Sequence, residues 1–220
     1  MRKVIFIFFT ICFLYPCFCL NIPQAKNSPS PNSCCDWETL KKTWENYCDN
    51  PSSKNAYRVY MVLPKKQPKD ATRHTHKIGG NVKKLMLETL SILEKEIYAS
   101  DRNSVKIAFR LFTISDGLLT EDLCIILGHF ICINPKMFLE ELKEHRHLVS
   151  FIMDSLLGNL GEEYVDKMEA SYLEMIRRIK CIEGVKDNSL LQMKDECLKE
   201  LNKAKKELEA IVQEKRGRCA

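Results

Sequence analysis

Two histidine pairs are the residues whose type and spacing could hold a metal ion. His74 and His76 lie in the segment PKKQPKDATRHTHKIGG, residues 64–80, and His145 and His147 form a second H-x-H pair. Imidazole is a common ligand of zinc and other transition metals, so four histidines that met in the fold would complete a tetrahedral site. Nothing in the sequence brings the pairs together, and H-x-H in a polar loop is usually solvated. A metal site is therefore the alternative hypothesis.

His129 and Cys132 are a second candidate for chemistry, because they stand one turn apart on one expected helix. A cysteine beside an imidazole is the arrangement that activates a thiolate nucleophile. Neither a nucleophilic serine nor an orienting carboxylate stands at a workable spacing from His129. A buried structural histidine is therefore favoured over catalysis, and no catalytic or cofactor-binding residue is predicted.

The stretch SDGLLTED gathers carboxylates and hydroxyls between two apolar runs. Asp116-Gly117 is typical of a helix end, because glycine readily adopts positive φ. Thr120 is predicted as the N-cap of the next helix, with Glu121 and Asp122 in its first turn, where carboxylates favour the positive helix end. The spacing lacks the alternating oxygen ligands of a calcium loop. We interpret the stretch as a corner between helices.

The N-terminus has the pattern of a secretory signal peptide. Arg2 and Lys3 precede an apolar run over residues 4–14, and Cys17 and Cys19 are small residues at the −3 and −1 positions of a cleavage site. The run is shorter than the roughly 20 apolar residues that cross a membrane. We predict cleavage after Cys19 and an exported chain, periplasmic or extracellular. Lipid attachment at either cysteine is an alternative, although neither follows the small residue of a lipobox.

Eight cysteines follow residue 19, and an even number in an exported chain permits disulfides without fixing their connectivity. A bridge from Cys34 or Cys35 to Cys48 is the first candidate. Cys124 and Cys132 lie eight residues apart in one expected helix. That spacing is about 12 Å along the axis, too far for a bond between them. No C-x-x-C motif occurs, so the cysteines do not indicate a zinc site.

Apolar residues recur at helical spacing through most of the chain. A helix is expected after Ser33, which begins an S-x-x-D capping pattern, with Trp37, Leu40, Trp44 and Tyr47 on its buried face. Further helices are expected at about 81–100, 105–115, 120–133, 135–142, 149–160, 162–183 and 188–215.

Two of these segments matter most for the fold class. Residues 123–133 are apolar all round apart from Gly128 and His129, which predicts a helix buried among other helices. Residues 55–63 fit a strand by alternation and a helix by their single apolar face. Because everything downstream is helical, we predict a helix there as well.

The expected organisation has four parts. A signal peptide at 1–19 and a flexible tether at 20–33 precede a helical domain at 34–160, which carries a basic loop at 64–80. Residues 161–220 form an antiparallel helical hairpin with a coiled-coil-like seam, packed on that domain or extending from it. The predicted fold class is all-α, built as stacked helix pairs of the HEAT or armadillo type or as an irregular bundle.

The segments AFRLFTISDGLLTEDLCIILG and MDSLLGNLGEEYVDKMEA resemble a group of exported bacterial proteins of unknown function. The resemblance covers roughly residues 100–200. It implies an all-α, HEAT-like periplasmic or lipid-anchored protein and brings no catalytic residues with it.

These observations lead to an exported, non-catalytic helical protein that serves as a protein-binding or scaffold module with an unidentified protein partner. The net charge of +5 falls to +3 without Arg2 and Lys3, too little to indicate a nucleic-acid partner. The alternative function is a metal-binding protein or enzyme that uses His74 and His76 with His145 and His147.

Overall fold

A computed structural model describes residues 36–64, 80–115, 117–146, 149–158, 160–161, 164 and 167–218. All regular elements in these residues are helical, and no strand occurs among them, which confirms the predicted all-α class. Cys35–Ala220 form one compact unit, so the predicted helical domain and hairpin belong to the same unit.

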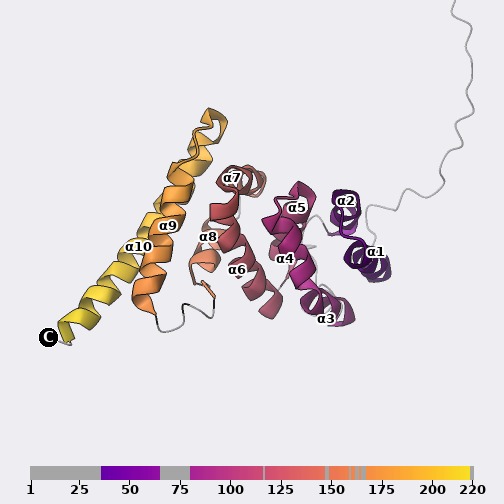
Figure 1. Ribbon diagram of the computed structural model, residues 1–220, viewed down its shortest axis with the longest axis horizontal. Helices are drawn as coiled ribbons and strands as arrows, with labels where there is room; N and C mark the ends of the chain where they lie inside the picture. The colour runs from indigo at the N-terminus through magenta and orange to yellow at the C-terminus, as the bar shows by residue number, and fades with distance from the viewer. Residues whose placement is uncertain are drawn as a thin grey trace, which may run out of the picture. The chain divides into compact units, whose positions relative to one another are not determined.

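The helices follow one another through this unit in chain order (Figure 1). Their bounds are α1 Trp37–Asp49, α2 Ser53–Val62, α3 Gly80–Glu88, α4 Leu90–Tyr98, α5 Arg102–Ile114, α6 Leu118–Ile133, α7 Pro135–Glu144, α8 Val149–Gly158, α9 Met168–Glu183, the 3₁₀ helix η3 Asn188–Leu190, and α10 Leu191–Arg218.

Helix α1 docks on the rest of the unit through the predicted apolar stripe. Leu40, Trp44 and Tyr47 are buried. The Asp36 side chain accepts hydrogen bonds from the first-turn amides of Glu38 and Thr39 and so caps the helix. The predicted cap, Ser33, lies outside the described residues.

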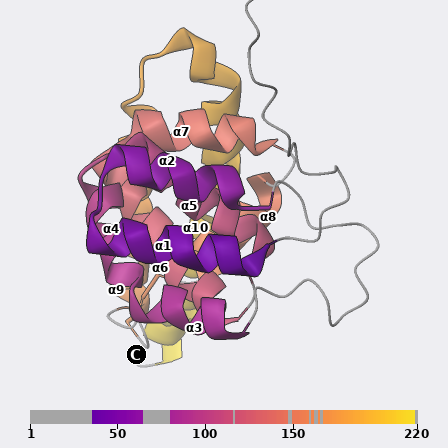
Figure 2. The ribbon, with the colours of Figure 1, turned by 90° about the vertical axis from the view of Figure 1, so that its right-hand side faces the viewer.

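Helix α2 confirms the helical prediction for residues 55–63. Its N-cap is Ser52, whose hydroxyl accepts from the amide of Asn55. The helix ends before Pro64, since the residue preceding a proline is driven out of the helical region. Figure 2 shows α1 and α2 side by side, with α3 next to α1, at this end of the unit.

The helix predicted over residues 81–100 is two helices, because it breaks at Thr89. The Thr89 hydroxyl donates to the carbonyl oxygen of Leu85 at 2.7 Å and accepts from Nε1 of Trp44 at 2.8 Å. A threonine that bonds back to the preceding turn bends a helix. Thr89 lies on the apolar stripe of this segment, where its hydroxyl accepts the hydrogen bond from the indole of Trp44.

The corner between α5 and α6 differs in detail from the prediction. Gly117 has a φ of 57°, a positive value that favours glycine, and it stands at the N-cap position of α6. Thr120 is therefore not the cap, and its hydroxyl pairs with that of Ser115 at 2.9 Å. Glu121 lies in the first turn as predicted, and Asp116 lies outside the described residues.

Helix α6 is the centre of the unit, as its all-apolar sequence predicts. Most of its length from Leu119 to Ile131 is buried, and it contacts α3, α4, α5, α7, α8 and α9. In a stacked-repeat protein each repeat contacts only its neighbours. The wide range of partners around α6 therefore favours the irregular bundle over stacked pairs.

Helices α9 and α10 form the predicted antiparallel hairpin (Figure 1). Lys194, which interrupts the apolar seam in the sequence, closes the turn. Its Nζ donates to the carbonyl oxygens of Glu183 at 2.6 Å and Val185 at 2.8 Å. A lysine suits this place because the last carbonyls of a helix lack backbone partners and carry partial negative charge. A disulfide between Cys132 and Cys181 joins the hairpin to α6.

Candidate functional site

Only one of the four histidines predicted as metal ligands falls within the described residues. The others lie outside them: His74, His76 and His147. His145 follows α7 directly, with its Nδ1 2.9 Å from the carbonyl oxygen of Glu141 and its ring stacked on Phe109 at 5.5 Å between centroids. Within the described residues, no three histidine, cysteine, aspartate or glutamate side chains are grouped to hold a metal ion. The four-histidine site stays a prediction.

The Cys–His pair is corrected by the structure. Cys132 is bonded to Cys181, with 5.3 Å between their Cα atoms, so its sulfur is oxidised and offers no thiolate. His129 instead has its Nδ1 3.1 Å from the hydroxyl of Tyr98. The expectation that Cys124 and Cys132 cannot bond to each other is confirmed, since Cys132 is bonded to Cys181 and Cys124 is a buried thiol.

The predicted bridge to Cys48 is wrong. Cys48 is a free thiol near the C-terminal end of α1, whereas Asp36 caps the other end. Cys34 and Cys35, the other candidates for this bridge, lie outside the described residues.

A charged cavity of about 410 Å³ lies between α5, α7 and the turn of the hairpin, and we call it the α5–α7 cavity. It is lined by Tyr60, Arg102, Lys106, Glu140, Glu141, Lys143, Glu144, His145, Ser189 and Leu190. Three cationic and three anionic side chains face it, so the cavity does not select for one sign of charge by its lining alone. His145 is the one predicted site residue among them.

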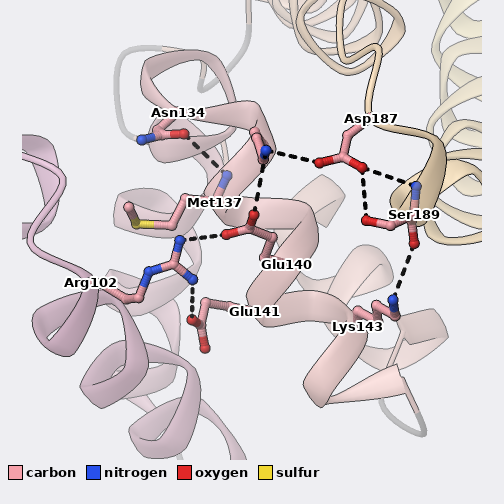
Figure 3. A network of polar contacts seen from close by, with 9 residues as sticks. Arg102, Asn134, Met137, Glu140, Glu141, Lys143, Asp187 and Ser189 are labelled. Atoms are coloured by element: carbon pink, nitrogen blue, oxygen red, sulfur yellow. Dashed lines mark hydrogen bonds and ion pairs between the residues drawn. The ribbon is translucent and has the colours of Figure 1, made fainter.

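A network of polar contacts holds one side of this cavity (Figure 3). Arg102 of α5 bonds to Glu140 and lies 3.5 Å from an oxygen of Glu141, both on α7. Lys136 of α7 is 2.8 Å from Asp187 in the hairpin turn. These contacts fix α7 against α5 and against the turn, so the cavity wall is tied together by residues from three elements.

Glu141 is the buried carboxylate of the cavity. It is 2% exposed, and the one ion pair that it forms with a described residue is the long contact to Arg102. Burial raises the pKa of Glu141, while Lys106 and Arg102 act in the opposite direction. A carboxylate removed from water needs a partner to remain charged, and 3.5 Å lies at the limit of a hydrogen bond.

Tyr60 also lines the cavity, and two cations contact its ring. Arg110 places its guanidinium 4.5 Å from the ring centroid and donates from Nη2 to the phenol oxygen at 2.6 Å. The ammonium of Lys106 lies 5.9 Å from the same centroid. Both contacts are of cation–π type, and they fix the ring and bring Lys106 to the cavity.

A second hollow, more apolar, lies between α1 and α2, the two helices that Figure 2 shows side by side. This α1–α2 groove has a volume of about 340 Å³ and is lined by Thr43, Asn46, Asn55, Tyr57, Arg58, Met61 and Val62. Tyr57 and Met61 are each 51% exposed, and Val62 is 37% exposed. The groove thus gathers large apolar side chains that face solvent within one helix.

Comparisons with protein-family models, curated proteins and solved structures find no match for this chain. The resemblance to exported bacterial proteins is therefore still an expectation. No helix in the described part of the chain is both long and apolar enough to cross a bilayer.

Apart from His145, the residues of the α5–α7 cavity carry no signal in the sequence that predicts a site. A signal of a buried charge is present in α7, where Glu141 falls on the same face as the buried Phe138 and Leu142. A carboxylate in the apolar stripe of a helix indicates a buried charge with a specific partner. The partner, Arg102, is distant in sequence, so the pattern of α7 alone could not name it.

Proposed function

We propose that this protein is an exported, non-catalytic module that binds another protein through the α1–α2 groove. The supporting observation is the outer stripe of α2, where Tyr57, Met61 and Val62 are exposed together beside a groove. Single exposed apolar residues are ordinary on a protein surface, but apolar residues that rim a hollow mark interaction sites.

The charge on α2 indicates the chemistry of the partner. Lys54 and Arg58 lie on the same stripe as the apolar residues, and the helix sequence SKNAYRVYMV contains no carboxylate. Arg58 bonds to the side chain of Asn55 and forms no ion pair with a described acidic residue. An amphipathic helix that carries apolar side chains flanked by carboxylates would complement this stripe in both shape and charge.

Export is supported by the disulfide between Cys132 and Cys181, because such bonds persist chiefly in oxidising compartments. Export also agrees with the signal-peptide pattern at the N-terminus. The mass of the mature chain, purified from cells that express it naturally, tests this part of the proposal. We expect a chain that begins at Leu20, and a full-length chain that starts at Met1 would contradict export by this route.

Site-specific photo-crosslinking tests the binding function. A benzoyl-phenylalanine is placed at Tyr57 in the groove, and at Leu173, an exposed apolar residue of α9, as the matched control. We expect an adduct with one protein from the native compartment at Tyr57 and none at Leu173. Equal adducts at both positions, or none at Tyr57, would contradict the proposal.

The affinity of the captured protein gives the quantitative test. Titration of the purified partner should show a loss of at least about tenfold for Arg58→Glu, because reversing a rim charge opposes an acidic partner. Lys84→Glu serves as the control, since Lys84 is an exposed α3 lysine outside the groove. Unchanged affinity for Arg58→Glu would show that the partner is not recognised by its carboxylates.

A further inference from the structure

We propose that the α5–α7 cavity binds a small zwitterion that carries both an ammonium and a carboxylate group, as free amino acids and short peptides do. The cavity shares no lining residue with the α1–α2 groove, so this inference is independent of the proposed protein-binding function. Its volume of about 410 Å³ is that of a small-molecule site.

The anionic half of the site is Glu141 with Glu144. Arg102 bonds closely to Glu140, and among the described residues this leaves Glu141 with the 3.5 Å contact alone, although its side chain is almost fully buried. Glu144 lines the same cavity and has no ion-pair partner among the described residues. A ligand ammonium would give this carboxylate shorter, charge-assisted hydrogen bonds than the 3.5 Å contact to Arg102.

The cationic half is Lys106 with Lys143. The ammonium of Lys106 faces the ring of Tyr60, and that of Lys143 donates to the carbonyl oxygen of Ser189 at 3.1 Å. Neither lysine lies within ion-pair distance of a carboxylate in the described part of the chain. Two ammonium groups without a carboxylate partner at one cavity are suited to binding a carboxylate.

The two halves are close but not in contact. Lys106 lowers the pKa of Glu141 through space, so each lies within the electrostatic field of the other, yet they form no ion pair. A plain anion would leave Glu141 without compensation, and a plain cation would meet the field of both lysines. A ligand with one charge of each sign is attracted by both halves.

The walls restrict the shape of the ligand. Tyr60 is fixed by Arg110, and the His145 ring is held by its stack on Phe109 and its contact with the Glu141 carbonyl. A site built on side chains that are already ordered loses little conformational entropy on binding. The charged groups of an amino acid would therefore meet a preformed cavity.

Isothermal titration of the full mature chain, with its disulfide intact, tests the proposal. The probes are the free amino acids, a set of dipeptides, and two half-ligands, acetate and ethylammonium, all at low ionic strength. We expect at least one amino acid or dipeptide to bind at least about tenfold more tightly than either half-ligand. Acetate that binds as tightly as the best zwitterion would show an anion site, and no binding by any zwitterion would overturn the proposal.

Variants identify the site. Glu141→Gln and Lys106→Met each remove one charge and should each reduce the affinity for the best probe at least tenfold. Glu88→Gln and Lys84→Met are the controls, because they change an exposed ion pair on α3 outside the cavity. Circular dichroism of each variant shows whether it is folded. A folded Lys106→Met that binds as the wild type does would overturn the assignment even if Glu141→Gln failed to fold.

Discussion

Arg178 is the most deeply buried charge of the described residues, and its surroundings explain how the bundle tolerates it. It is 0% exposed, and its guanidinium bonds to Glu174 at 2.9 Å and to the carbonyl oxygen of Leu156 at 3.0 Å. Burial lowers the pKa of Arg178. Burial also raises that of Glu174, but the hydrogen bonds from Arg177 and Arg178 leave it below its ordinary value. Removing one member of such a pair costs far more than the pair contributes.

Gly128 of α6 makes room for this guanidinium, and we predict that Gly128→Ala destabilises the protein. A Cβ at this position would lie 2.7 Å from Nη2 of Arg178. The guanidinium is held by its hydrogen bonds and cannot withdraw freely. Overpacking of this kind costs about 1–3 kcal/mol, which exceeds the gain of up to about 1 kcal/mol from replacing glycine in a helix. Urea denaturation measures the difference.

Two variants control this prediction. Gly80→Ala adds the same methyl group within α3 where no atom lies within 4 Å, so it should not lower the free energy of unfolding. Arg178→Met, made in wild type and in Gly128→Ala, forms a double-mutant cycle that isolates the clash. If the two changes were simply additive, the guanidinium would not be the cause of the loss.

At the scale of elements, the disulfide joins α6 to α9 across a sequence separation of 49 residues. Closing a loop of that length in the unfolded chain stabilises the folded state by about 2–4 kcal/mol. We expect the double variant Cys132→Ser/Cys181→Ser to lose stability by this amount in urea denaturation. A reducing agent should lower the stability of the wild type and leave that of the double variant unchanged. A wild type that is insensitive to reductant would contradict the prediction.

The hairpin turn carries a pH-dependent contact. Hydrogen bonds from Lys136 and Ser189 lower the pKa of Asp187 to about 2. A carboxylate with a depressed pKa in the folded state contributes stability that is complete above its ordinary pKa of about 4 and is lost as the pH falls through its folded value. We therefore expect the turn to loosen between about pH 4 and pH 2, measured by NMR titration of the Asp187 carboxyl carbon. In Lys136→Met the same resonance should titrate at a higher pH, and an unmoved midpoint would contradict the role of the lysine.

Most helices and several of their ends could be predicted from the sequence, because caps and apolar stripes are local signals. Asn134 caps α7, with Pro135 at its first position, as the sequence predicts. The errors have local causes too. Thr89 breaks a helix because its hydroxyl hydrogen-bonds to the carbonyl oxygen of Leu85 and to the indole of Trp44. Gly117, and not the predicted Thr120, occupies the N-cap position of α6.

The candidate sites could not be predicted in the same way. The α5–α7 cavity joins side chains of α2, α5, α7 and the hairpin turn, and their meeting depends on how the helices pack. The disulfide has the same origin, since Cys132 and Cys181 meet only because α6 and α9 are neighbours. Periodicity indicates which face of a helix is buried, but not which helix covers it.

At the scale of the whole molecule, the position of α6 among its neighbours predicts how the unit responds to truncation. Helix α9 covers part of α6, and α10 packs on α8. A chain that ends after Gly158 should therefore expose the apolar surface of α6 and bind the dye ANS, with no cooperative thermal transition. A chain that ends after Gln213 is the control, because it keeps every residue of α10 known to be buried. Cooperative unfolding of the shorter chain would contradict a shared core.

The hydrogen bond from Trp44 to Thr89 also has a spectroscopic consequence. Both tryptophans of the protein, Trp37 and Trp44, lie on α1, and Trp44 is fully buried with its indole nitrogen bonded across to the break between α3 and α4. Intrinsic fluorescence excited at the tryptophans is therefore a local signal that follows the undocking of α1, whereas far-ultraviolet circular dichroism sums over all the helices. If both signals are recorded in one denaturation experiment, a difference between their midpoints would show that α1 undocks before the other helices unfold. Coincident midpoints would show that α1 unfolds together with the hairpin at the other end of the chain.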